Sequence, residues 1–157
     1  MTSLTIGDEA PEFCLPDSAL GEICLNELKG KWVVLYFYPK DGTKGCTMEA
    51  VEFTLAEDEF TDKNAVIIGV SPDSPGSHKK FEDKNDLTIT LLSDEEKDTL
   101  EKYDVWQKKK MFGREYMGVV RSTFLIDPQG NIAYIWPKVK VDGHADEVLE
   151  KLVELQE

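Results

Sequence analysis

An apolar run, a short loop and a helical pattern in direct succession constrain the fold of this chain more than any other feature. Residues 32–38 read WVVLYFY, and a run so rich in β-branched and aromatic side chains predicts a strand buried on both faces. Pro39 ends it, because proline cannot donate to a β-ladder, and a loop with two glycines follows over residues 40–45. From Cys46 to Phe60, apolar side chains recur at a helical spacing. The segment therefore predicts a strand, a tight loop and a helix with a cysteine in its first turn.

The expected position of Cys46 at a helix start favours a reactive thiol. A thiol reacts as its thiolate, and the first turn of a helix offers unpaired backbone N–H groups and the positive end of the macrodipole. Thr43, three residues earlier, can direct its hydroxyl at the sulfur or at what the sulfur attacks. The alternative is that Cys46 is a small buried hydrophobic residue, the usual state of a free cysteine. Spacing alone leaves both interpretations open.

The loop before the cysteine resembles the Pro-x-x-x-Thr-x-x-Cys signature of peroxiredoxins. Residues 39–46 read PKDGTKGC, and the fuller string FYPKDGTKGCTMEAVEF is similar to the bacterioferritin comigratory protein (PrxQ) branch. The likeness continues through GVSPDSPGSHKKF, LLSDEE, YDVW and RSTFLIDPQGNI, and so covers nearly the whole chain. The resemblance implies that Cys46 is reactive and that Pro39 shields its sulfur and shapes the loop.

Length and charge exclude several other classes. The 157 residues predict a single domain, residues 1–157, large enough to bury a core. A net charge of −13 argues against nucleic acid and anionic membrane surfaces as partners. We expect no secretory signal and no membrane span. Three cysteines without a C-x-x-C motif, and two distant histidines, give no metal signature, and the odd cysteine fits a reducing cytoplasm.

The remaining pattern predicts alternating strands and helices. Residues 11–25 predict two short strands joined by a turn over residues 17–21, and the cysteine helix should end near residue 62. Further strands are predicted over 65–70, 88–92, 119–127 and 132–136, helices over 77–84 (N-capped by Ser74 or Ser77), 94–103 and 145–156, and a basic surface loop over 106–118. This order indicates an α/β sandwich around a mixed sheet. The resemblance implies a thioredoxin-like fold, with helices on both faces of the mixed central sheet and an added N-terminal β-hairpin.

Arg121 is the second candidate for the site. It is one of two arginines and stands in the otherwise apolar or small string GVVRSTFLID, where its charge must find an anion or face water. The pattern leaves open an arginine at the exposed start of a strand. The resemblance implies that it lies beside Cys46, with Arg114 the weaker candidate. Glu49, one turn along the helix, either orients Arg121 or is an exposed acid near the helix start.

These residues predict a thiol-dependent peroxidase. A positive charge beside a thiolate favours the charged form, and Arg121, Thr43 and the helix N–H groups can hold a peroxide by its two oxygens. Cys46 would become a sulfenic acid in reducing hydrogen peroxide or organic hydroperoxides, with no metal or organic cofactor. The alternative is a redox-sensing or chaperone-like protein that uses the same cysteine.

The thiol that resolves the sulfenic acid is left open by the sequence. Many members of the branch have a cysteine where this chain has Val51, or within the segment that matches residues 81–86, and this chain has none at either place. The candidates are Cys14, Cys24 or an external thiol such as a thioredoxin, glutaredoxin or small thiol. A turn over residues 17–21 places Cys14 opposite Cys24, close enough for a disulfide. The favoured expectation is that both stay reduced, and that Cys46 acts as a one-cysteine peroxidase in a monomer or weak dimer.

Overall fold

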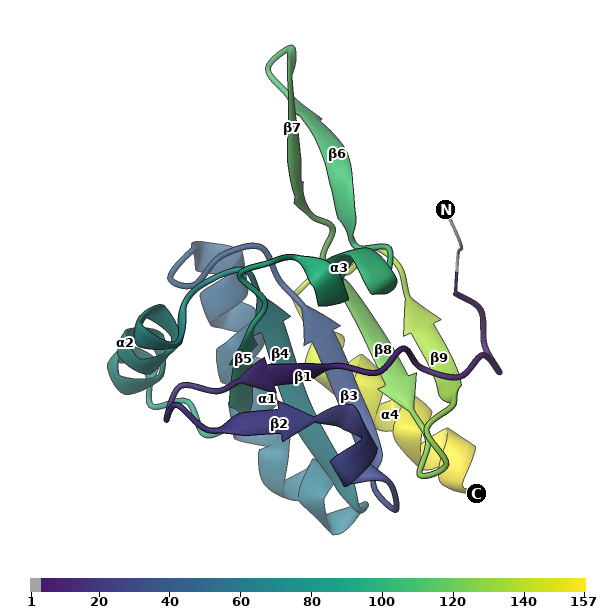
Figure 1. The fold of residues 1–157 in the computed structure, drawn as a ribbon. Helices are drawn as coiled ribbons and strands as arrows, with labels where there is room; N and C mark the ends of the chain where they lie inside the picture. The colour runs from purple at the N-terminus through teal and green to yellow at the C-terminus, as the bar shows by residue number, and fades with distance from the viewer. Residues whose placement is uncertain (1–3) are drawn as a thin grey trace.

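A five-stranded mixed sheet forms the centre of the computed structural model, which describes residues 4–157 (Figure 1). In spatial order its strands are β5 (Thr90–Ser93), β4 (Ala65–Ser71), β3 (Trp32–Phe37), β8 (Ser122–Ile126) and β9 (Ile132–Trp136). β3 is parallel to β4 and antiparallel to β8. Every residue of β3 after Trp32 is buried, which confirms the prediction of a strand buried on both faces.

Two helices cover one face of this sheet. α1 (Lys44–Asp62) and α4 (His144–Gln156) pack against each other behind the sheet in Figure 1. Their apolar side chains join Val34 and Tyr36 of β3 in one core cluster, which also contains Cys46. α2 (Pro75–Asn85) contacts the edge strand β5 and begins at the predicted N-cap Ser74, whose hydroxyl accepts a hydrogen bond from the Ser77 N–H.

The opposite face is covered by the N-terminal segments and one short helix. These are the hairpin β1 (Cys14–Pro16) and β2 (Glu22–Cys24), the 3-10 helix η1 (Leu25–Leu28) and α3 (Asp98–Lys102). A second core cluster lies on this face. The side chains of Val33, Leu35 and Phe37, which alternate along β3 with those of Val34 and Tyr36, belong to it. The predicted α/β fold with an added N-terminal hairpin is therefore confirmed. No helix within residues 4–157 has both the length and the apolar character needed to cross a membrane.

The N-terminal hairpin has the predicted register. Cys14 pairs with Cys24, and the turn is fixed by Asp17, whose Oδ1 accepts hydrogen bonds from the Ala19 and Gly21 N–H groups at 2.9 Å each. The two cysteines are joined by a disulfide. The expectation that both remain reduced was wrong for this structure, since opposed positions in the ladder bring the two sulfurs together.

Two other predictions need correction. Residues 106–118 are not a loop but a second hairpin, β6 (Trp106–Met111) and β7 (Arg114–Val119), which projects from the body in Figure 1. Its turn residues Phe112 and Gly113 both have positive φ, 53° and 78°, as a two-residue hairpin turn requires. The helix expected over 94–103 shortens to α3 because its N-cap residue Lys97 has a positive φ of 65°, which a continuous helix does not allow. Asp94 lies before this break and accepts a hydrogen bond from the Leu100 N–H at 2.8 Å.

Candidate active site

Cys46 is the third residue of α1 and lies at the end of the loop that follows β3. Its side chain is a free thiol and is buried, with 1% of its surface exposed. It lies on the stripe of α1 that faces the sheet. The predicted placement in the first helical turn is confirmed, and the thiol therefore lies where backbone N–H groups and the helix dipole favour an anion.

Arg121 lies between β7 and β8 and contacts the thiol directly. Its Nη2 donates a hydrogen bond to Cys46 Sγ at 3.3 Å, and its Nη1 donates to Glu49 Oε1 at 2.6 Å. Gly45 makes room for this contact, because a Cβ there would lie 3.2 Å from Nη2. One planar guanidinium thus joins the sulfur and a carboxylate of the same helix, a geometry that an ammonium cannot reproduce.

Glu49 is buried rather than exposed at the helix start, with 1% of its surface accessible. Burial raises the pKa of Glu49 to about 7, although the charge and hydrogen bond of Arg121 act in the opposite direction. Its second oxygen, Oε2, has no hydrogen-bond partner among residues 4–157, and so only one side of the carboxylate is compensated. Arg121 remains charged, since Glu49 and Cys46 raise the pKa of Arg121 more than burial lowers it.

The raised pKa of Glu49 predicts a pH dependence of stability. Between its usual 4.5 and about 7 the folded protein holds a proton that the unfolded chain has released. The group therefore contributes stability below 4.5 that is lost as the pH rises through 7. The free energy of unfolding in urea, wild type minus Glu49→Gln, should fall as the pH rises across this range. A difference that rises with pH would mean that the ion pair with Arg121 lowers the pKa of Glu49 more than burial raises it.

Comparisons with known proteins identify the family. The model of the AhpC/TSA family matches residues 6–135. The chain belongs to the AhpC/TSA family. It is 48% identical over 155 residues to peroxiredoxin Bcp of Bacillus subtilis, a match that covers 99% of each protein. It is 38% identical over 154 residues to peroxiredoxin Bcp of Escherichia coli, covering 98% of this chain and 99% of that protein.

Solved structures agree with this assignment. A mutant PrxQ of Xylella fastidiosa matches with a TM-score of 0.94 at 39% identity, over 100% of both chains. The bacterioferritin comigratory protein of Xanthomonas campestris, studied for its alkyl peroxide reduction activity, matches with a TM-score of 0.89 at 40% identity over 92% of each chain. The chain is thus a peroxiredoxin of the Bcp/PrxQ branch, a thiol-dependent peroxidase with a thioredoxin-like fold.

The other residues named from the sequence of this peroxiredoxin lie in the loop before Cys46 and on the projecting hairpin. Thr43 is the exposed N-cap residue of α1, and its hydroxyl donates to the Lys40 carbonyl at 3.1 Å rather than to the sulfur. Pro39 is half-buried just beyond the end of β3. Arg114 is exposed on the projecting hairpin. The first-turn cysteine and Arg121 are thus brought together, whereas Thr43 belongs to the loop that precedes them.

Two features of the site were not identified from the sequence. Lys109, half-buried on β6, has a lowered pKa because of burial and the nearby charge of Arg121, while Cys46 acts in the opposite direction. The segment 106–118 gave no strand signal, and so Lys109 was expected in a loop.

The second feature is a cluster formed by Asp41, Asp73 and His78. Their potential metal-ligand atoms lie within 4.8 Å of one another. These atoms already hydrogen-bond with neighbouring groups, however, so the cluster is a satisfied polar network. It anchors the loop that precedes Cys46, and no local pattern in the sequence predicts it.

Proposed function

We propose that Cys46 is the peroxidatic residue of this enzyme and that Arg121 is its electrostatic partner. The observation that carries the proposal is the guanidinium that donates to Cys46 Sγ and to Glu49 Oε1 at once. A fixed positive charge beside the sulfur favours the thiolate, and Glu49 holds that charge in place. Cys46 is also the only cysteine of the chain that is not in a disulfide in this structure.

The chemistry of the first step follows from these groups. The thiolate attacks the nearer oxygen of a hydroperoxide, a sulfur–oxygen bond forms, and the oxygen–oxygen bond breaks. The far oxygen leaves as hydroxide or alkoxide and takes a proton to give water or an alcohol, while Cys46 is oxidised to a sulfenic acid. Arg121 and the first N–H groups of α1 would stabilise the charge that develops on the leaving oxygen. Substrates would be hydrogen peroxide and small organic hydroperoxides, including alkyl hydroperoxides of the class studied with the Xanthomonas relative.

We propose further that an external thiol completes the cycle. A first thiol condenses with the sulfenic acid, releasing water and leaving a mixed disulfide, and a second thiol reduces that disulfide to restore Cys46. Cys46 belongs to the core cluster on the α1 face of the sheet, whereas Leu15 of the Cys14–Cys24 hairpin belongs to the cluster on the opposite face. The central sheet therefore lies between the hairpin and the sulfur, which favours a thioredoxin, a glutaredoxin or a small thiol as the reductant.

The same proposal includes a cytoplasmic location and a monomer or weak dimer. A free thiol that must be regenerated by an external thiol needs a reducing compartment. Cys46, Glu49 and Arg121 all belong to one chain, as a monomeric or weakly dimeric enzyme requires.

Turnover measurements test this function. Peroxide consumption is followed with three reductants in parallel: dithiothreitol, a thioredoxin with its reductase, and glutathione with a glutaredoxin. We expect many equivalents of peroxide to be consumed per chain with at least one of them, and the preferred system identifies the reductant class. Consumption that stops after one equivalent with every reductant would instead support the redox-sensing alternative.

A further inference from the structure

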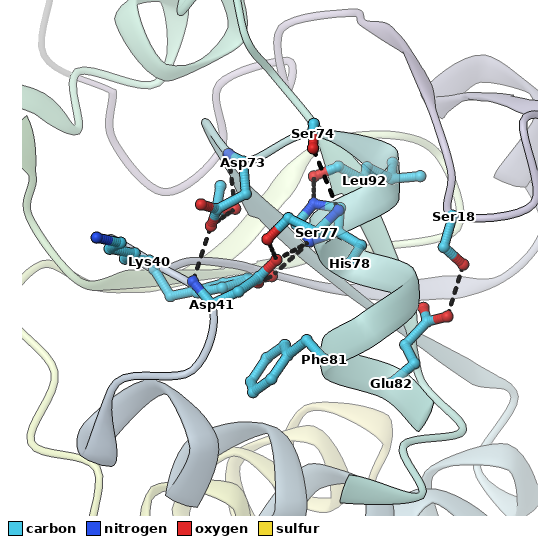
Figure 2. A network of polar contacts seen from close by, with 12 residues as sticks. Ser18, Lys40, Asp41, Asp73, Ser74, Ser77, His78, Phe81, Glu82 and Leu92 are labelled. Atoms are coloured by element: carbon cyan, nitrogen blue, oxygen red, sulfur yellow. Dashed lines mark hydrogen bonds and ion pairs between the residues drawn. The ribbon is translucent and has the colours of Figure 1, made fainter. Parts of the chain in front are cut away.

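The loop of residues 39–45 is tied to the body of the protein through Asp41 (Figure 2). Asp41 Oδ1 accepts a hydrogen bond from the Tyr38 hydroxyl at 2.7 Å, and Oδ2 accepts one from Ser77 Oγ at 2.8 Å. Oδ2 also lies 2.7 Å from His78 Nδ1, and the backbone N–H of Asp41 donates to Asp73 Oδ2 at 2.8 Å. The loop is thus attached to the end of β3, to the residues after β4 and to the first turns of α2.

His78 is the centre of this network and is completely buried, with 0% of its side chain exposed. Its Nε2 lies 3.0 Å from the Leu92 carbonyl oxygen, which can only accept, so Nε2 carries a proton. Its Nδ1 lies 2.7 Å from the Asp41 carboxylate and 3.3 Å from the Tyr38 hydroxyl. Because that hydroxyl donates its proton to Asp41 Oδ1 and the ionised carboxylate only accepts, Nδ1 also carries a proton. The geometry fits an imidazolium that donates from both nitrogens.

The charged groups around His78 agree with this assignment. Burial works against the charged form, but the hydrogen bond and charge of Asp41, together with the Leu92 carbonyl and Asp73, raise the pKa of His78 above 6.5. A neutral His78 donates from only one nitrogen, so loss of the proton would set a lone pair against the Asp41 carboxylate or the Leu92 carbonyl. The contribution of His78 to the attachment of the loop is therefore fully present below 6.5 and is lost as the pH rises through its higher pKa in the folded state, while the bonds of Asp41 with Tyr38, Ser77 and Asp73 do not depend on this proton.

The anchored loop ends at the reactive sulfur. Cys46 follows Asp41 by five residues, and Gly45 lies directly under the guanidinium of Arg121. Movement of the loop would therefore change the alignment of Cys46 Sγ with Arg121 Nη2. Displacements of about 1 Å in a reacting group can cost on the order of 100-fold in rate.

We propose that His78 and Asp41 are positioning residues for the peroxide reaction: their buried imidazolium–carboxylate pair anchors the loop of residues 39–45 and so holds Cys46 against Arg121. This inference rests on the proposed role of Cys46. It assigns His78 no contact with the peroxide, and its effect on the rate passes through the loop.

Two variants separate the charge of the pair from its shape. In Asp41→Asn the amide can donate to a neutral His78 Nδ1 and its oxygen can accept from Tyr38, so the contacts persist without charge. In His78→Gln the donor to Asp41 is lost. Ser18→Ala is the matched control, because it removes the 2.6 Å hydrogen bond from Ser18 Oγ to Glu82 on α2, which does not touch the loop (Figure 2).

The experiment measures the rate of Cys46 oxidation by hydrogen peroxide in stopped flow as a function of pH, with urea unfolding of each variant at the same pH values. We expect His78→Gln to react on the order of 10-fold to 100-fold more slowly than wild type. Wild type should lose rate on the alkaline side where His78 loses its proton, Asp41→Asn should lack that loss, and Ser18→Ala should follow wild type. If His78→Gln fails to fold, the comparison of wild type with Asp41→Asn decides the question.

Proton NMR of the two histidines gives an independent measurement of the pair. His78 should titrate above 6.5 in wild type and below that in Asp41→Asn, whereas burial lowers the pKa of His144. A folded His78→Gln with the wild-type rate and pH profile, or a His78 that titrates below 6.5, would overturn the inference while leaving the role of Cys46 intact. If Cys46 of the wild-type protein does not react with peroxide, both the inference about His78 and the proposed role of Cys46 are wrong.

Discussion

Cys46→Ser is expected to reduce no peroxide above the uncatalysed background. A serine hydroxyl is not ionised at neutral pH and cannot become a sulfenic acid, so the first step is lost whatever the remaining groups do. The substitution replaces one small buried side chain by another, so the fold should persist. The measurement is stopped-flow peroxide consumption, with circular dichroism to confirm the fold.

Cys14→Ser and Cys24→Ser are the matched controls for this prediction. Both remove a thiol, but their hairpin packs on the opposite face of the sheet from the Cys46 cluster. Each should retain the wild-type rate of Cys46 oxidation, while losing the disulfide that joins them. Full peroxide reduction by Cys46→Ser would show that the assignment of the peroxidatic residue is wrong.

Arg121→Ala should slow the reaction with peroxide by on the order of 10²–10³-fold, the usual cost of removing a preorganised donor to a developing anion. Arg121→Lys should recover little of this rate. Two nitrogens of the guanidinium serve two different groups, Cys46 Sγ and Glu49 Oε1, and a single ammonium cannot occupy both positions. Both variants also disturb the ion pair of the buried Glu49 and so lower the stability of the fold. The rates are therefore compared under conditions in which urea titration shows each variant to be folded.

Arg114→Ala is the control, because it removes the other arginine of the chain from an exposed position on the projecting hairpin. It should react with peroxide within about twofold of wild type, as surface substitutions away from a site have small effects. A larger loss in Arg114→Ala than in Arg121→Ala would show that the wrong arginine has been assigned to the step.

The parts of the fold that the sequence predicted correctly depend on strong local signals. β3 is a continuous apolar run ended by Pro39, and the helical spacing of α1 extends from Cys46 to Phe60. The register of the N-terminal hairpin followed from its turn, because side-chain direction alternates strictly along a strand. Arg121 could be singled out because a cation in an apolar string needs an anion or water, and the partner in the structure is the one that the family resemblance implied.

The parts that were missed depend on contacts distant in sequence or on exposed strands. The side chains of β6 and β7 are mostly exposed or half-buried, so no apolar alternation marks them. His78 and Asp41 are 37 residues apart, and no local pattern reveals that they form a buried pair. Whether Cys14 and Cys24 are oxidised depends on redox conditions as well as register, and sequence addresses only the register.

Peptide mass mapping after one equivalent of hydrogen peroxide, in the presence of dimedone and without any reductant, tests whether Cys46 is the peroxidatic residue. We expect a dimedone adduct on the Cys46 peptide, with the Cys14–Cys24 disulfide unchanged and the adduct absent when a thiol is added first. An unmodified Cys46, or a dominant disulfide between Cys46 and Cys14 or Cys24, would contradict it.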